Sequence, residues 1–152
     1  MFEPRFSSDD LSGRTIQCET DGKQRSAYQY DSGYRELATL PCGLEVVFRA
    51  VHPEDKRLLA EGMKKLSSAT RYSRFLTDKT SLSGPELAYL TELDGHNHFA
   101  IGVVRPFPGG GEIGVGVARF VRLKDNPEVA EPAVTVIDEY QGCGVGTALL
   151  RR

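Results

Sequence analysis

The sequence predicts one α/β domain that combines strands and helices. Its 152 residues are the length of one ordinary domain. Short β-branched runs between Pro and Gly clusters indicate strands, and apolar residues at helical spacing indicate helices. Residues 1–43 are polar, and their apolar residues repeat with neither the period of a strand nor that of a helix. This predicts a flexible N-terminal extension and places the domain at residues 44–152.

The first half of this domain is predicted to hold one strand followed by three helices. Residues 44–51 (LEVVFRAV) form a β-branched run bounded by Pro and Gly, which is typical of a strand. A helix is predicted over 53–66, because a proline suits its first turn and its leucines and methionine share one face. Serines at the start of 67–76 cap a second helix, and Ser83 with Glu86 forms a capping box for a third.

The second half is predicted to be mostly strands. Residues 99–104, 113–123 and 132–138 are rich in β-branched residues and are separated by turn-forming residues. The glycines at 109–111 are interpreted as a hairpin connection rather than a phosphate site, because no helix opens directly behind them. After the third strand, residues 141–152 lead into a last helix.

Composition and charge exclude several classes of function. The 19 basic and 21 acidic residues nearly balance, so we expect neither a nucleic-acid nor a membrane partner. No apolar run is long enough for a membrane span, and the start of the chain does not resemble a signal peptide, which predicts a cytoplasmic protein. Cys18, Cys42 and Cys143 are predicted to be reduced thiols. His96 and His98 are interpreted as turn residues, so no metal is predicted.

The loop at residues 141–146 (QGCGVG) carries the strongest functional signal. It joins a strand to a helix, where main-chain N–H groups lack partners within the helix and favour an anion. Alternating glycines allow several amides to approach one diphosphate. A Walker loop would need a lysine after the last glycine, and a dinucleotide fingerprint would need an early βαβ unit. A turn that only caps a helix would need a single glycine.

The segment 131–150 (EPAVTVIDEYQGCGVGTALL) resembles the acetyl-CoA-binding segment of the GNAT (Gcn5-related) N-acetyltransferase family. The loop of that family reads Gln/Arg-x-x-Gly-x-Gly/Ala, and Gln141, Gly144 and Gly146 occupy its fixed places. The resemblance covers roughly residues 44–152. Within the family the chain is most similar to the GNAT domains of bacterial protein-lysine acetyltransferases, which also show a Glu-x-Ala-Val-x-Val-x-Asp run before the loop.

The resemblance implies a mostly antiparallel mixed sheet flanked by helices, in which the strand before the loop splays from a neighbour. It also implies that main-chain groups of this strand bind the pantetheine arm of acetyl-CoA, the co-substrate. The residues assigned to coenzyme binding in this way are Val136, Ile137, Gln141, Gly142, Cys143, Gly144, Val145, Gly146 and Thr147.

For catalysis, the resemblance implies direct acetyl transfer to a primary amine of a protein lysine or a small molecule. The amine must lose a proton, because the ammonium of lysine has an ordinary pKa near 10.4. Glu131 corresponds to the glutamate that the lysine-acetyltransferase branch uses as general base. A purely structural Glu131 stays open as an alternative, and Glu128 or Asp138 could equally be surface carboxylates. Cys143 is interpreted as a bystander, because the family forms no acyl-enzyme.

The chain also departs from the family pattern. It ends about two turns into the helix after the loop, so the resemblance implies that the C-terminal portion of the fold is missing, together with the general acid. An unpaired sheet edge favours association with a second copy or with a completing chain. Three functions therefore remain: an N-acetyltransferase, an acyl-CoA-binding regulatory module or inactive fragment without turnover, and a structural subunit without coenzyme.

Overall fold

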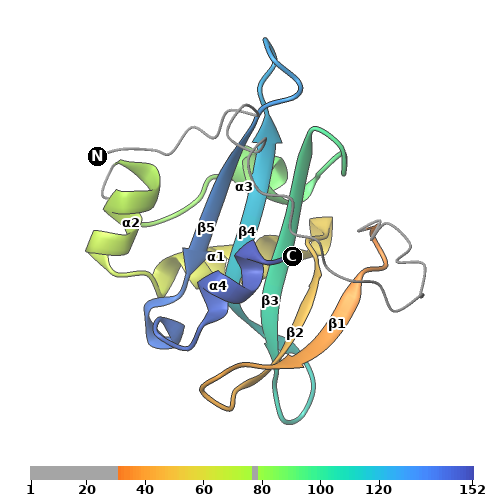
Figure 1. Ribbon diagram of the computed structural model, residues 1–152. Coiled ribbons are helices and arrows are strands. Elements are labelled where there is room, and N and C mark those ends of the chain that lie inside the picture. Colours follow the sequence, from red (N-terminus) through yellow and green to blue (C-terminus); the bar gives the residue numbers. More distant parts are fainter. Residues whose placement is uncertain (1–30, 77–78) are drawn as a thin grey trace, which may run out of the picture.

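The computed structural model describes residues 31–76 and 79–152, which form a five-stranded sheet with helices on both faces (Figure 1). The strands follow one another across the sheet in chain order, and each of the four pairings is antiparallel. This confirms the predicted α/β class. The strands are β1 (Arg35–Thr39), β2 (Glu45–Ala50), β3 (His98–Pro106), β4 (Glu112–Arg122) and β5 (Ala130–Val136).

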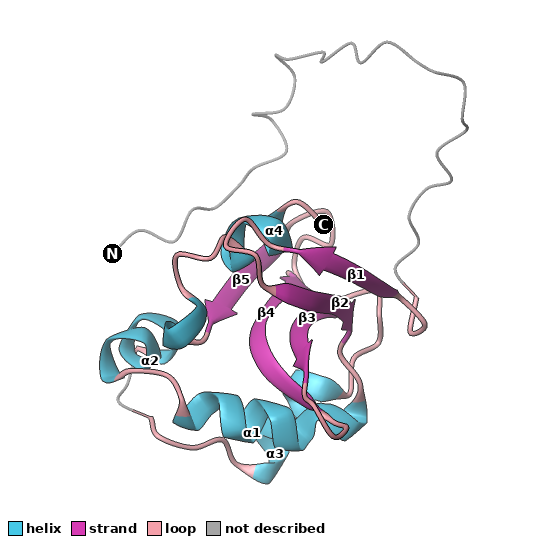
Figure 2. Cartoon of the chain, turned by 90° about the horizontal axis from the view of Figure 1, so that it is seen from below, coloured by secondary structure: helices cyan, strands magenta, loops and turns pink. Residues whose placement is uncertain are grey.

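The helices form two layers around the sheet. Figure 2 shows α4 on one face of the sheet and α1 and α3 on the other, while α2 lies beyond β5. No helix among the described residues has the length and apolarity needed to cross a membrane. The helices are η2 (Pro53–Asp55), α1 (Lys56–Lys64), α2 (Ser68–Phe75), α3 (Gly84–Thr91), η3 (Asp138–Tyr140) and α4 (Val145–Leu150).

The predicted capping residues begin the helices as expected. The Ser67 hydroxyl accepts a hydrogen bond from the Thr70 amide at the start of α2. At α3, Ser83 and Glu86 bond each other's main-chain amides, which is the predicted capping box. The predictions of one strand, three helices, three strands and a final helix after residue 44 are confirmed.

The predicted start of ordered structure at Leu44 is wrong, because β1 precedes it. This strand pairs with β2 through the register Leu37↔Val47, inside the segment predicted to be an extension. Most of β1 is exposed, and Leu37 is exposed although apolar, so the strand shows no alternation between a buried and a solvated face. The rest of the predicted extension, residues 1–30, lies outside the described part of the chain.

The α4 helix approaches the sheet closely at Gly116. A Cβ atom at this position would lie 3.0 Å from the carbonyl oxygen of Thr135 and 3.2 Å from Cγ1 of Val145. Only glycine therefore allows β4, β5 and α4 to meet here. Val145 and Leu149 are buried in the main core cluster, and this contact fixes the position of α4 and of the loop before it.

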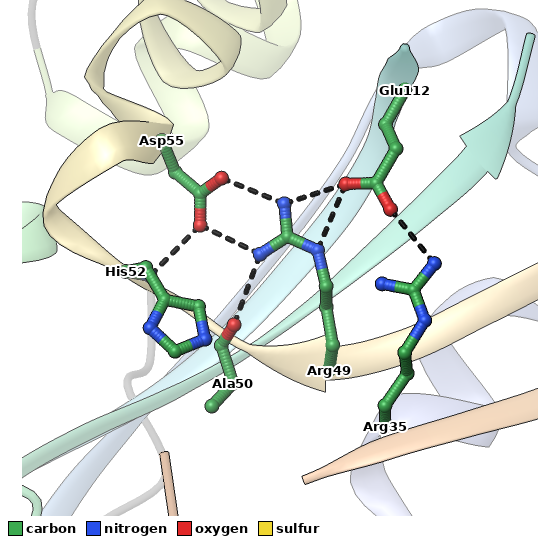
Figure 3. A network of polar contacts seen from close by, with 6 residues as sticks. All are labelled: Arg35, Arg49, Ala50, His52, Asp55 and Glu112. Atoms are coloured by element: carbon green, nitrogen blue, oxygen red, sulfur yellow. Dashed lines mark hydrogen bonds and ion pairs between the residues drawn. The ribbon is translucent and has the colours of Figure 1, made fainter. Parts of the chain in front are cut away.

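A partly buried ionic network connects β1, β2, η2 and the start of β4 (Figure 3). The Arg49 guanidinium on β2 donates two hydrogen bonds to Asp55, with N···O distances of 2.7 and 2.8 Å. It also donates to Glu112 at the start of β4, which accepts a further bond from Arg35. Burial alone would raise the pKa of Asp55, but hydrogen bonds from Arg49 and the His52 amide outweigh it and lower that pKa.

We expect Asp55→Ala to lower the free energy of unfolding by about 3–5 kcal/mol, because it leaves the Arg49 charge buried with a single carboxylate partner. Since the pKa of Asp55 is lowered in the fold, its contribution is present above the ordinary aspartate pKa and is lost as pH falls through the folded value. Urea unfolding of both proteins from pH 7 to pH 2 measures this. The difference in stability should shrink in acid, and the exposed pair Arg57–Glu61 supplies a control variant, Glu61→Ala, of little effect.

Candidate functional site

The glycine-rich loop has two residues in the left-handed backbone region just before α4. Gly142 and Gly144 have φ angles of +81° and +84°, in the left-handed region that favours glycine. Gly144 is the N-cap of α4, so the amides of the first helical turn have no acceptor within the helix and open toward the loop. A Cβ at Gly144 would lie 3.3 Å from the Pro41 ring, which packs against the loop from the β1–β2 turn.

The loop is held in place by side chains on both sides. Nε2 of Gln141 donates to the carbonyl oxygen of Val136 at 3.2 Å and to the Thr70 hydroxyl at 3.4 Å. Asp138 accepts a hydrogen bond from the Ser67 amide. Hydrogen bonding by the Ser67 side chain, and then by its amide, lowers the pKa of Asp138. The Gln141 side chain therefore connects β5 to α2.

The β5 strand presents an open edge beside the Gln141 side chain. The amide of Ile137 donates to the carbonyl of Val115 on β4, at 3.0 Å. Because main-chain groups alternate in direction along a strand, those of Val134 and Val136 point away from β4. Val136 and Ile137 at the end of this strand were both predicted to bind the coenzyme. The side chain of Ile137 is buried in the core, so only Val136 faces the open edge.

A hollow of about 320 Å³ runs along this edge between β5 and α2. It reaches the loop at Gln141, which lines it together with residues of β5. The α2 side of the hollow was not predicted from the sequence, although its hydroxyl residues at helical spacing were a signal for a polar face. The hollow is lined by Thr70, Ser73, Arg74, Val134, Thr135, Val136 and Gln141.

Glu131 lies at the other end of β5 from the loop. It is exposed, pairs with Val121 on β4, and faces the same side of the sheet as Thr135, four residues along the strand. Five residues separate it from Val136, or about 17 Å at 3.3 Å per residue. A donor bound at the loop therefore reaches Glu131 only through an extended arm laid along β5.

A second hollow, a cavity of about 110 Å³, lies between the sheet and helices α1 and α3. It shares Arg74 and Thr135 with the edge hollow, so the two spaces adjoin. Its walls are mainly aliphatic, from α1 and from β3 and β4. Arg119 on β4 also lines it and was not predicted, although a charged residue in the buried-face register of an apolar strand was a signal.

Gly146 differs from the other loop glycines. Its position lies within α4, and a Cβ would make ordinary contacts with Val136 and Val134 at 3.9 and 4.0 Å. We expect Gly146→Ala to raise the free energy of unfolding by about 0.5–1 kcal/mol, because alanine reduces the backbone entropy lost in a helix. Thermal and urea unfolding measure this. A loss of stability would show that α4 cannot accept a methyl group against β5.

Two acetyltransferases are similar in sequence to this chain. No family model matches the chain. The acetyltransferase PA5475 of Pseudomonas aeruginosa is 29% identical over 131 residues, which are 86% of this chain and 69% of that protein. The acetyltransferase Pat of Mycolicibacterium smegmatis is 36% identical over 104 residues, which are 67% of this chain and 29% of Pat.

Among solved structures, the GNAT domain of S. lividans PAT superposes with a TM-score of 0.71. The match covers 80% of this chain and 70% of that domain at 22% sequence identity, so it shows the shared fold. The chain therefore has the fold of a GNAT domain, and its relatives in sequence are named acetyltransferases. Its glycine loop, α4 and the open β5 edge are the parts that the resemblance in the sequence assigns to the coenzyme.

Proposed function

We propose that this GNAT protein transfers an acetyl group from acetyl-CoA directly to a primary amine. The observation that carries the proposal is the hollow along the open β5 edge, which reaches the glycine loop at Gln141. The first turn of α4 offers several main-chain amides at one end of this surface. Val134 offers its main-chain N–H and C=O along the rest of it, as an edge strand does, and Val136 offers its N–H, because its carbonyl already accepts from Gln141.

The two parts of the surface suit two parts of acetyl-CoA. Amides around Gly144 suit the diphosphate, because hydrogen bonds to charged groups contribute about 1.5–3 kcal/mol each. The helix dipole adds about 0.3–1 kcal/mol, so directed amides dominate. The amides of the pantetheine arm suit the main chain of β5, and the thioester then lies toward Glu131.

The chemistry needs a proton acceptor near the thioester. We propose that Glu131, directly or through a water molecule, takes a proton from the ammonium of the acceptor. The neutral nitrogen then attacks the thioester carbonyl, a C–N bond forms, and the C–S bond breaks with release of the coenzyme thiol. A main-chain N–H of the open β5 edge is suited to stabilise the developing oxyanion.

Coenzyme binding without turnover is the second candidate, and one observation favours it. Glu131 is exposed and has no hydrogen-bond or ion-pair partner among residues 31–76 and 79–152, so the chain does not fix its side chain in a catalytic position.

We propose the cytoplasm as the location of the protein, because Cys42 and Cys143 are both free thiols, which is typical of reducing compartments.

Titration calorimetry with acetyl-CoA, followed by a thiol-release assay over lysine peptides and small amines, tests the proposal. We expect one saturable site per chain and amine-dependent release of coenzyme thiol. Binding without release for any amine would favour the second candidate. Intact-protein mass spectrometry without an amine should detect no acetylated Cys143, and an acetyl-cysteine there would contradict direct transfer.

A further inference from the structure

Arg119 is a buried guanidinium that no carboxylate neutralises within the described residues. Its side chain projects from β4 into the cavity beneath α1 and α3, and the residue is 8% exposed. Nη1 contacts the carbonyl oxygen of Leu90 at 3.3 Å and Nε2 of His98 at 3.2 Å. A guanidinium has five N–H donors, so these two contacts leave most of its hydrogen-bonding capacity for a ligand.

Arg49 provides a comparison within the same sheet face. It is 9% exposed, nearly the same as Arg119, but hydrogen bonds with Asp55 and Glu112 satisfy its charge. Buried charges in folded proteins are ordinarily paired in this way. Of these two arginines, Arg119 is therefore the one without a carboxylate partner among the described residues. The cavity beside it is the space where a negative group would fit.

The local electrostatics agree with a missing anion. Burial, and then the positive charge of Arg74, lower the pKa of Arg119 to about 10. Burial, and then the charge of Arg119, also lower the pKa of His98, although Asp94 acts in the opposite direction. Nε2 of His98 lies 3.2 Å from the guanidinium, which carries only donors. Burial is the first cause of both pKa shifts, and a neighbouring positive charge adds to each.

The place of the cavity relates it to the proposed reaction. It adjoins the edge hollow at Thr135 and Arg74, beside the path that the arm of a donor bound along β5 would take toward Glu131. Arg119 pairs with Ala133 on β5, two residues from Glu131, so both side chains are on one face of the sheet. The walls of the cavity are largely aliphatic, and Val117 and Leu90 are among the residues that line it.

We propose that this cavity binds a carboxylate carried on a short apolar stem, with Arg119 as the group that recognises it. The proposal rests on the proposed acyl transfer and names the chemistry of one substrate. The carboxylate belongs either to the far end of a dicarboxylic acyl group on the coenzyme or to an acceptor that carries an amine at its other end. In both cases the stem occupies the aliphatic part of the cavity and the carboxylate contacts the free donors of Arg119.

A structural role for Arg119 makes a different prediction. Its contact with Leu90 could serve to cap the C-terminal end of α3. Arg119→Met would then unfold more readily. If Arg119 instead binds a ligand, methionine of similar length replaces an unpaired buried charge, and the variant should be at least as stable as the original chain.

The first test uses butyrate and its uncharged counterpart butyramide, with ¹⁵N chemical shifts of the main-chain amides as the measurement. We expect butyrate to shift the amides of Arg119, Val117 and Thr135 in a saturable way, and butyramide to bind at least about tenfold more weakly. Arg119→Met should abolish the butyrate response, whereas Arg105→Met, at an exposed arginine, should keep it. No saturable butyrate binding, or binding that Arg119→Met leaves intact, would overturn the proposal.

The second test separates the two sources of the carboxylate. The rates with succinyl-CoA and butyryl-CoA compare two donors that differ mainly in the terminal group. The rates with 4-aminobutyrate and butylamine make the same comparison for two acceptors. A preference of about tenfold or more for the charged member, lost in Arg119→Met, identifies the source. If neither pair is discriminated, the proposed substrate role is wrong. Acetyl-CoA titration of Arg119→Met is independent, so failure of coenzyme binding is distinguished from failure at the cavity.

Discussion

Gly144→Val should weaken acetyl-CoA binding by about 10²–10⁴-fold. Valine cannot adopt the left-handed φ of +84° without strain, and its side chain would meet the Pro41 ring. The chain must then rotate the amides before α4 away from the diphosphate. Loss of two hydrogen bonds to a charged group costs about 3–6 kcal/mol, which gives that range of dissociation constants. Titration calorimetry measures it.

Gly109→Val is the matched control for this variant. Gly109 also has a left-handed φ, of +97°, but lies in the β3–β4 hairpin with open space around its Cβ position. It should carry a similar cost in backbone strain and leave the affinity for acetyl-CoA unchanged. Thermal unfolding checks that both variants are folded. If both then bind acetyl-CoA with equal affinity, the loop is not part of the binding site.

Glu131→Gln should lower kcat by about 10²–10⁴-fold, with little change in acetyl-CoA affinity. Glutamine keeps the shape of the side chain but cannot accept a proton from the ammonium, and general bases contribute roughly this factor. Steady-state thiol release over pH 6–10 measures the effect. Rate should recover partly at high pH, where more of the acceptor amine is already neutral.

Glu128→Gln supplies the comparison for Glu131→Gln. Glu128 is an exposed carboxylate just before β5 and has no assigned part in the reaction. A loss of kcat that is equal in both variants would point to a general effect of surface charge. Asp138 is less suitable as a base than either, because its carboxylate already accepts from the Ser67 amide.

The sequence predicted those elements whose local pattern also decides their packing. The capping serines of α2 and α3 act through neighbours three residues away, so tertiary structure changes them little. The glycine loop was predicted because diphosphate binding needs main-chain geometry that only glycine provides at Gly144. By contrast, β1 is held by its pairing with β2 and buries little of its own surface. Its sequence therefore shows no alternation of buried and exposed residues.

The parts of the site that were missed depend on contacts between distant segments. The contacts of the Gln141 side chain with Val136 and with Thr70, the latter 71 residues away in the chain, were not predicted. The α2 wall of the edge hollow arises in the same way. For Arg119, the sequence shows a charge on an apolar strand, whereas the missing carboxylate is apparent only once Leu90 and His98 are placed around it.

The central claim is that the amides of the glycine loop and the open edge of β5 together hold acetyl-CoA. Backbone ¹⁵N chemical shifts recorded during a titration of the chain with acetyl-CoA test this most directly. We predict saturable shifts at residues 142–147 and at Val134 and Val136, with the hairpin at 109–111 unaffected. Saturation without a response in the loop or along β5, or no saturable response at all, would contradict the claim.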